Sequence, residues 1–521
     1  MNDVQRDMTM DPWAGYGAMA EAVLTPENRF LAHARGGGNC LLTGMAGTGK
    51  TTLIKEFIAT APTRVSITAP TGVAALNAGG MTLHRFCGMM LGPEAGQGNE
   101  EYFAQLRRDP RRSILAGFNR VLHCETLIID EISMLPGRQF EFVEFLFRRL
   151  RGRDEPFGGV QVIAVGDFLQ LPPVRTDDCA AYDWAFLTPA WAAAGFKTYV
   201  LDTVRRQDEP AFVNALGQFR QGRVWGEAAR LLQARVRNFP PSNLTRLYTH
   251  NVQVDKWNDF QLGELPGEPV VMRAEQTGPE LQRAFLTKNL LTPETLRLKA
   301  GAMVMFTVNR MERGATRPTY VNGQVGVVEH IEGMPSPPAP LPEGEGGFLY
   351  GDDDTQGGTR SSLCPGLSAL APSGLQSAPA GVGGSGGRIW VRTRGEVIPV
   401  ERFTWRYSQD DPGSATFAQF PLRLAWAMTI HKSQGLTLDA AYLDIRAARE
   451  PGQAYVAVSR VRTLAGLHFK DWFKGVHVSP EAIEFYRKAE VGGPQNTRND
   501  TNNGIYRRGA LGRKPTSAGR W

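Results

Sequence analysis

Residues 39–52 hold the side chains best suited to chemistry in this 521-residue chain. The stretch fills the spacing G-x-x-x-x-G-K-S/T, in which glycines let backbone N–H groups curl around phosphate oxygens, lysine reaches the β- and γ-phosphates, and the hydroxyl ligates Mg²⁺. A strand is expected over 40–42 and a helix over 51–58, whose N-terminus adds partial positive charge. These features predict a site for ATP and Mg²⁺. The expected contacts are Gly44, Ala46, Gly47, Thr48, Gly49, Lys50, Thr51 and Thr52.

Two further strands are predicted to end in polar groups. The apolar stretch 126–131 ends in Asp130 and Glu131. Asp130 is suited to hold Mg²⁺ together with the P-loop threonine, and Glu131 to polarise an attacking water. The next buried strand, 162–165, precedes Gln170, whose neutral amide can sense a γ-phosphate and align water. Three such strand ends in this order indicate a RecA-type nucleotide-binding core.

A third polar segment follows the strand predicted over 64–69. Its loop begins at a strand end, where open α/β sheets bind ligands. The residue types in this segment can hydrogen-bond a phosphate or stack on a base, although a lone histidine or phenylalanine is more often part of a core. The candidate DNA contacts are Thr71, Gly72, Thr82, His84 and Phe86.

Bulk composition is globular, with 42% hydrophobic and 21% charged residues. Of the net charge of +6, residues 491–521 supply +5, because six basic residues there face one acidic residue, Asp500. DNA binding must therefore depend on local motifs rather than on bulk charge. No apolar run approaches the roughly 20 residues of a membrane span, and residues 1–27 lack a signal pattern, so a cytoplasmic, nucleoid-associated protein without membrane contact is expected. The five cysteines lack Cys-x-x-Cys spacing, which disfavours a zinc ribbon.

Several motifs together resemble the Pif family of DNA helicases, in the RecD-related, 5′-to-3′ branch of superfamily 1. They are Asp130-Glu131-Ile132-Ser133-Met134, Gly166-Asp167-Phe168-Leu169-Gln170-Leu171-Pro172-Pro173 and, most specifically, Pro156-Phe157-Gly158-Gly159-Val160-Gln161. The segment 69–86 matches the family's DNA-contacting motif. The resemblance extends over residues 24–475.

The resemblance implies roles for residues in the second half. Arg206 and Arg460 would reach the γ-phosphate, and Lys50, Glu131, Gln170, Arg206 and Arg460 would form the catalytic set. Gly435 would contact the nucleotide, while His431, Ser433 and Gln434 would contact single-stranded DNA. Two positions depart from the family pattern. Arg205 replaces the usual aromatic residue, and the segment leading into the P-loop offers Asn28 rather than glutamine for the adenine edge, where a helix N-terminal turn is an equal alternative.

The expected architecture is α/β, with two RecA-like P-loop domains, a small wedge insertion and an SH3-like β-barrel insertion. The first domain would span 1–205 and carry the wedge at 89–120, where the arginines either face DNA or form a solvated surface. The second would combine 206–295 with 416–490, around a barrel at 296–415. Within the barrel, the Gly/Pro/Ser-rich stretch 333–387 is expected to be disordered, like the basic tail 491–521.

The resulting hypothesis is a monomeric, ATP-dependent 5′-to-3′ helicase that moves on single-stranded DNA and unwinds tailed or forked duplex in replication, repair or recombination. Two alternatives stay open from the sequence. One is a DNA-binding or remodelling ATPase that does not separate strands, and the other is a RecD-like subunit of a larger nuclease.

Overall fold

The computed structural model describes residues 25–90, 92–94, 96–175, 181–237, 244–310, 319–332, 387–393, 395–407, 413–472 and 475–491. The predicted disordered stretch (apart from its last residue) and the basic tail beyond residue 491 lie outside these residues, as does the N-terminal segment 1–24. Within the described part, no helix combines the length and apolar character needed to cross a membrane.

The first half of the chain forms a six-stranded sheet, in the order β3-β2-β4-β5-β1-β6, whose neighbours all pair in parallel. Every residue of β1 and β4 is buried, as expected for central strands covered on both faces. Parallel strands end at one edge, so the loops after β1, β2, β4, β5 and β6 gather there. The strands are β1 (Cys40–Gly44), β2 (Val65–Ala69), β3 (Met81–Thr82), β4 (Thr126–Ile129), β5 (Gln161–Val165) and β6 (Lys197–Leu201).

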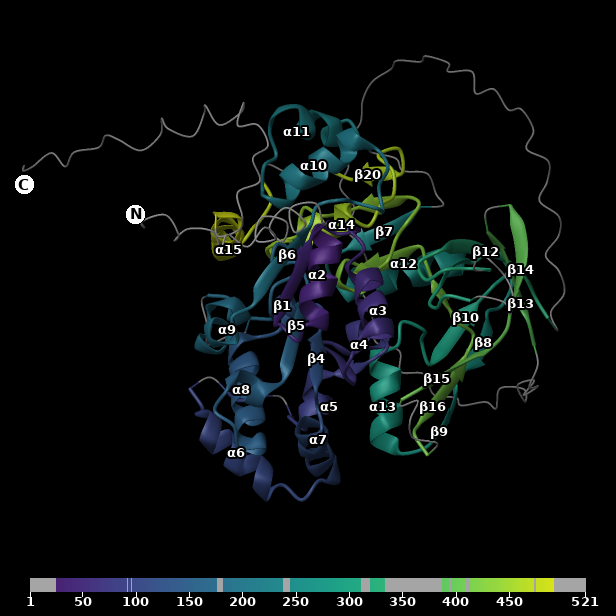
Figure 1. Ribbon diagram of the computed structural model, residues 1–521. Helices are drawn as coiled ribbons and strands as arrows, with labels where there is room; N and C mark the ends of the chain where they lie inside the picture. The colour runs from purple at the N-terminus through teal and green to yellow at the C-terminus, as the bar shows by residue number, and fades with distance from the viewer. Residues whose placement is uncertain are drawn as a thin grey trace, which may run out of the picture.

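Helices cover this sheet (Figure 1). They are α2 (Pro26–Arg35), α3 (Lys50–Thr60), α4 (Gly72–Ala78), α5 (Leu83–Cys87), α6 (Asn99–Arg108), α7 (Arg112–Leu122), α8 (Gly137–Arg151) and α9 (Pro189–Ala194), with short 3-10 turns η1 (Ile132–Met134), η2 (Pro156–Gly159) and η3 (Ala185–Leu187). The mixed composition of residues 102–120 predicts a single helix, and this prediction is wrong, because α6 and α7 are separated at Asp109–Arg111. Pro110 lacks an N–H donor and disfavours helical geometry in the residue before it.

The Pro-Phe-Gly-Gly stretch serves packing. Phe157 is fully buried with φ of +52°, and its ring contacts Phe140 and Phe147 of α8 at centroid distances of 5.4 and 6.1 Å. The Arg151 side chain donates to the Gly158 carbonyl at 2.9 Å. Gln161 then donates to the carbonyls of Ala34 and Gly38, at 2.7 and 2.9 Å. The motif that most resembles the family thus fixes α8 and α2 against the sheet.

A second, four-stranded parallel sheet has the order β18-β7-β19-β20. Its strands are β7 (Thr245–Tyr248), β18 (Ala427–Thr429), β19 (Ala441–Leu443) and β20 (Leu467–Phe469). The helices that precede or connect these strands are α10 (Pro210–Arg220), α11 (Gly226–Gln233), α12 (Asn251–Glu264), η4 (His431–Ser433) and α14 (Gln453–Val458). Because paired residues of the neighbouring strands β7 and β18, such as Arg246 and Ala427, are 181 residues apart in sequence, the intervening chain must leave the sheet and return.

The intervening chain forms antiparallel sheets on one side of the molecule (Figure 1). A five-stranded sheet has the order β14-β13-β12-β11-β17, a three-stranded sheet is β15-β16-β9, and β10 pairs with β8. The elements are β8 (Val270–Arg273), β9 (Glu275–Thr277), α13 (Glu280–Asn289), β10 (Thr295–Leu298), β11 (Met303–Phe306), β12 (Val325–Ile331), β13 (Ile389–Thr393), β14 (Glu396–Val400), β15 (Phe403–Arg406), β16 (Thr416–Gln419) and β17 (Leu422–Leu424).

One predicted strand in this region is wrong. The apolar stretch 420–429 predicts one strand that leads into His431, but it forms two, because β17 pairs with β11 in the antiparallel sheet whereas β18 joins the second parallel sheet. The last element, α15 (Pro480–Val491), follows the second sheet but packs on the first, since Ala482 and Tyr486 belong to the apolar cluster that contains Phe168.

Candidate nucleotide and DNA site

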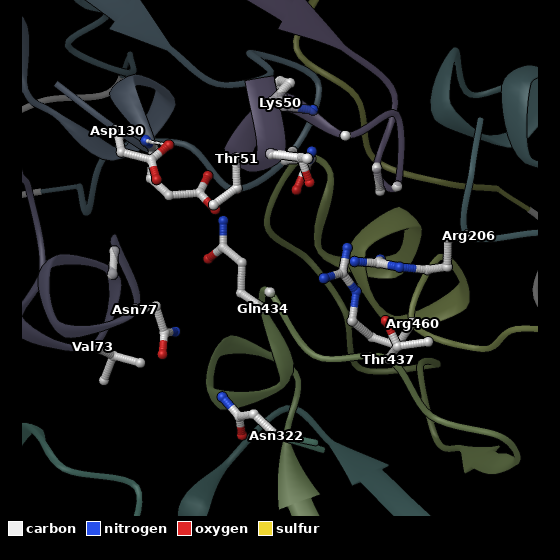
Figure 2. A pocket seen from close by; sticks show the side chains of 18 of the residues that line it. Lys50, Thr51, Val73, Asn77, Asp130, Arg206, Asn322, Gln434, Thr437 and Arg460 are labelled. Atoms are coloured by element: carbon white, nitrogen blue, oxygen red, sulfur yellow. Dashed lines mark hydrogen bonds between the residues drawn. The ribbon is translucent and has the colours of Figure 1, made fainter. Parts of the chain in front are cut away.

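The edge where the first sheet's strands end opens into a cavity of about 920 Å³ between the two halves of the chain. On one side it is lined by the P-loop, Asp130 and Glu131 from the first half of the chain, and on the other by Arg460 from the second half. Arg206 follows β6, and its backbone lies beside Gly47 of the P-loop. Figure 2 shows the two guanidinium groups side by side, across the cavity from Lys50 and Thr51. The tertiary structure therefore brings together the groups that the sequence placed up to 410 residues apart.

The P-loop has the geometry of a phosphate cradle. Lys50 Nζ donates to the carbonyls of Gly44 and Met45, at 2.8 and 2.9 Å, so the ammonium lies inside the loop. Gly47 has φ of +83°, and a Cβ there would lie 2.5 Å from Arg206 Cβ, which leaves room only for glycine. Gly49 caps α3 in the left-handed region, and Thr51 and Thr52 are exposed in the first turn.

The two carboxylates after β4 lie beside that loop. The Asp130 carboxylate accepts from the Glu131 N–H at 2.9 Å, and Glu131 has φ of +53°, a costly conformation for a residue with a side chain. Burial and then the Asp130 charge raise the pKa of Glu131 to about 7, against the attraction of Lys50. A carboxylate with that pKa is suited to accept a proton near neutral pH.

Gln170 lines the same cavity and is held by Asp167. Its backbone N–H donates to the Asp167 carbonyl at 2.9 Å, and its side-chain Nε2 donates to Asp167 Oδ2 at 3.3 Å. Asp167 is fully buried and pairs with Arg220 at 2.7 Å. Burial alone would raise the pKa of Asp167, but Arg220 and then Lys50 outweigh it and hold that pKa below its usual value. Asp167 stays ionised and fixes the glutamine at the cavity.

Arg206 and Arg460, here called the arginine pair, are two cations that line the cavity. Arg206 Nη1 donates to the Ser459 carbonyl at 3.0 Å, and Arg460, 2% exposed, donates to Val456 O and Ser459 Oγ at 2.8 Å each. Among the described residues, neither has a carboxylate within ion-pair distance. Burial, followed by the charge of Arg206, lowers the pKa of Arg460 to about 9. The pair is thus prepared for a strongly anionic ligand.

The predicted DNA contacts fall into two groups. Thr71, His431 and Gln434 line the cavity, and the Gln434 amide points toward Thr51 (Figure 2). Gly435, which was predicted to contact the nucleotide, lines the same cavity. The Thr71 hydroxyl also caps α4, accepting from the Ala74 N–H at 3.2 Å. Gly72 is the buried first residue of this helix, and a Cβ there would meet the Asn289 side chain at 2.1 Å. His84 is half-buried on α5, outside the cavity.

Three other predicted DNA contacts lie outside the cavity lining, and their side chains make structural contacts within the fold. Phe86 is 3% exposed within the apolar core, so its ring presents no face to a base, and this part of the prediction is corrected. Ser433 is fully buried and donates to the Ile430 carbonyl at 2.7 Å, which closes the turn at η4. The Thr82 hydroxyl, 9% exposed, caps α5 by accepting from the Arg85 N–H at 3.3 Å. The side-chain types of these three residues suggested DNA contact, but their burial in this structure disfavours a direct contact with DNA.

Other residues of the cavity were not among the predicted contacts. Val73 and Asn77 of α4 and Asn322 of the loop before β12 line its lower part (Figure 2), where Thr437 also lies. Arg205 lies at the rim, 3.4 Å from Glu27. Asn28 is absent from the lining and lies in the first turn of α2, so the alternative of a helix N-terminal turn is the one that the geometry supports.

The donor set fits a triphosphate with Mg²⁺. The described residues contain no group of three or more His, Cys, Asp or Glu side chains placed to hold a metal by themselves. Thr51 and Asp130 both line the cavity, and Mg²⁺ usually keeps several waters and binds through one or two protein oxygens plus phosphates. This pattern suits a metal that arrives with the nucleotide.

Comparison with known proteins places this chain in a family. A model described as PIF1-like helicase matches residues 30–223. An ATP-dependent DNA helicase Pif1 of Bdellovibrio bacteriovorus is 34% identical over 484 residues, which is 92% of this chain and 94% of the relative. The chain belongs to the PIF1-like helicase family.

Solved structures of the family share the fold. Pif1 of Bacteroides sp. in complex with ADP-AlF4 is 28% identical, with a TM-score of 0.68, and the match covers 90% of this chain and 98% of that one. Bacteroides Pif1 bound to ssDNA is 28% identical, with a TM-score of 0.55 over 90% of this chain and 97% of that one. The mixed α/β architecture with parallel sheets resembles these Pif1 helicases.

Proposed function

We propose that this chain is an ATP-dependent DNA helicase that moves 5′ to 3′ along single-stranded DNA. The observation that carries the proposal is the split cavity, which is lined on one wall by the P-loop, Glu131 and Gln170 from the first half of the chain and on the other by Arg460 from the second half. Because the two walls come from different halves of the chain, hydrolysis would depend on how the halves approach each other. A site of this kind couples ATP turnover to movement.

The residues divide the work as follows. Gly44, Gly47, Gly49 and the Lys50 ammonium hold the phosphates, while Thr51 and Asp130 hold Mg²⁺. Bound ATP with Mg²⁺ supplies the phosphoryl group and the charge that the site must neutralise. Glu131 accepts the proton of an attacking water that Gln170 aligns, and Arg206 and Arg460 stabilise the negative charge on the phosphoryl oxygens.

DNA would run along the wall beside the nucleotide. Thr71, His431 and Gln434 lie there, and changes in the distance between the halves would move their contacts along one strand. The relative bound to ssDNA supports nucleic acid as the partner. We further propose that the two parallel sheets are the centres of two RecA-like domains, that α6–α7 is a wedge, and that the antiparallel sheets around β11–β14 form an SH3-like insertion. The protein would act as a monomer.

A strand-displacement assay tests the proposal. Duplexes with a 5′ tail, a 3′ tail or a fork are mixed with protein and ATP, and release of the labelled strand is followed. Unwinding of the 5′-tailed and forked duplexes, with no release from the 3′-tailed duplex, is expected. ATP hydrolysis that DNA stimulates but that releases no strand would instead identify a remodelling ATPase.

A further inference from the structure

We propose that Tyr486 of α15 is a positioning residue for ATP hydrolysis, acting through Asp167 on Gln170. The inference rests on the proposed function, because it concerns the rate of that reaction. It adds the last described helix, which lies beyond the second parallel sheet in sequence, to the machinery of the nucleotide site. None of the motifs that indicate the family includes this helix.

The Tyr486 hydroxyl joins both sides of the phosphate region. It lies 2.6 Å from Thr43 Oγ1, on β1 directly before the P-loop, and accepts from the Phe168 N–H at 3.1 Å. It lies 3.2 Å from Asp167 Oδ1, to which it donates. Since a phenol has one proton and Asp167 is ionised, the Thr43 hydroxyl acts as donor to the phenol oxygen. One buried oxygen therefore holds the start of the P-loop and the turn after β5 together.

Asp167 connects the Tyr486 hydroxyl to the nucleotide cavity through hydrogen bonds. Its carboxylate is saturated behind the site by Arg220, whose Nη2 and Nε donate at 2.7 and 3.0 Å, and by the Leu169 N–H at 3.1 Å. On the cavity side, Oδ2 accepts from the Gln170 amide at 3.3 Å. Gln170 is the outermost member of this chain of contacts and the one that lines the nucleotide cavity.

Packing explains why α15 is in place but not why it carries a hydroxyl. Ala482 and Tyr486 are buried on the first half, and the Phe485 ring contacts Phe168 and Phe186 at centroid distances of 5.1 and 4.8 Å. A phenylalanine at 486 would satisfy the same apolar contacts. A buried hydroxyl is costly unless it is hydrogen-bonded, and here it has three partners. The contribution of the Tyr486 hydroxyl is to hold Thr43, Phe168 and Asp167 in alignment with one another.

The test compares Tyr486→Phe with the wild-type chain in steady-state ATPase assays with saturating single-stranded DNA. A fall in kcat of roughly 3- to 10-fold is expected, the equivalent of one net hydrogen bond, with KM for ATP unchanged. Thr43→Val, which removes the other hydroxyl of the same contact while keeping the shape, should lower kcat in the same way. Phe485→Leu is the matched control on α15, and it should lower thermal stability but keep kcat.

A double-mutant cycle separates positioning from general damage. If Tyr486 acts through the glutamine, Tyr486→Phe should change kcat by less than about 1.5-fold in a Gln170→Ala background. Additive losses, or a Tyr486→Phe variant with full kcat, would overturn the inference while leaving the helicase proposal intact. A wild-type chain without DNA-stimulated hydrolysis would overturn both.

Discussion

The front and the back of the nucleotide cavity are both rich in charge, but they are organised in opposite ways. At the front, the arginine pair lies side by side without a carboxylate partner among the described residues, and Glu131 and Asp130 are adjacent acids with raised pKa values. At the back, Asp167 is fully buried, and every oxygen is matched by Arg220, Tyr486 or a neighbouring donor.

This difference indicates that the front of the cavity binds the ligand, whereas the back positions the side chains that act on it. Unpaired buried charge is costly, and it is kept where a ligand of opposite sign will neutralise it. Paired buried charge adds little net stability over apolar packing, but it fixes geometry in one arrangement. The front should therefore respond to substitution mainly in turnover, and the back mainly in folding and alignment.

The largest loss of turnover is expected from Lys50→Ala. Its ammonium lies inside the P-loop, so removing it should lower ATP hydrolysis more than about 10³-fold and abolish unwinding together with it. ATPase and strand-displacement assays on the same preparation measure both. Unwinding that persists without hydrolysis would contradict the front's assigned role.

Arg220→Met should produce the largest loss of stability. It leaves the Asp167 carboxylate buried without its cation, which costs about 3–5 kcal/mol. Urea unfolding followed by tryptophan fluorescence measures the change. Adding Asp167→Asn should recover part of the loss, and a double variant less stable than the single one would refute the pairing as its cause.

Arg460→Ala should separate catalysis from binding. We expect kcat to fall about 10²- to 10³-fold, because charge on the transferred phosphoryl group loses a buried donor, while the affinity for a fluorescent ATP analogue stays within a few-fold. A loss of affinity as large as that of Lys50→Ala would count against this role. Arg462→Ala is a matched control, since that half-buried arginine lines the same cavity but pairs with Asp439 at 3.4 Å.

Glu131→Gln should abolish ATP hydrolysis but increase the stability of the folded protein at high pH. The folded-state pKa of about 7 lies above the ordinary 4.5, so the folded protein binds this proton more tightly and loses stability as pH rises from about 4.5 to 7. The glutamine should therefore stabilise the fold by on the order of 2 kcal/mol at pH 8, and have little effect at pH 4.5, while hydrolysis is lost. Thermal unfolding at the two pH values checks the sign, and a variant less stable at pH 8 than the wild type would contradict it.

The smallest effects are expected from the predicted DNA contacts, and they should follow burial. His431→Ala, at the cavity, should weaken binding of labelled single-stranded DNA severalfold, the size of one lost contact. Phe86→Leu should lower stability by about 1 kcal/mol and leave that affinity unchanged. The reverse pattern in a fluorescence anisotropy titration would restore the stacking role of Phe86.

Much of the front could be predicted from sequence because its residues lie in short local motifs. Lys50 follows Gly49, and Asp130 and Glu131 directly end a buried strand, so backbone geometry alone brings them to the sheet edge. The back could not be predicted in the same way. Arg220 is one arginine at the end of an ordinary helix, and Tyr486 lies 319 residues from the aspartate it contacts.

The same division holds across the protein. The sequence by itself determined the nucleotide chemistry, the family resemblance and the α/β class, since each depends on residue types at fixed short spacing. Only the tertiary structure decided which candidate side chains are accessible and that Phe86 and Ser433 are buried. It also decided that α15 packs on the first sheet. Burial and long-range pairing depend on what other segments cover, and no local pattern carries that information.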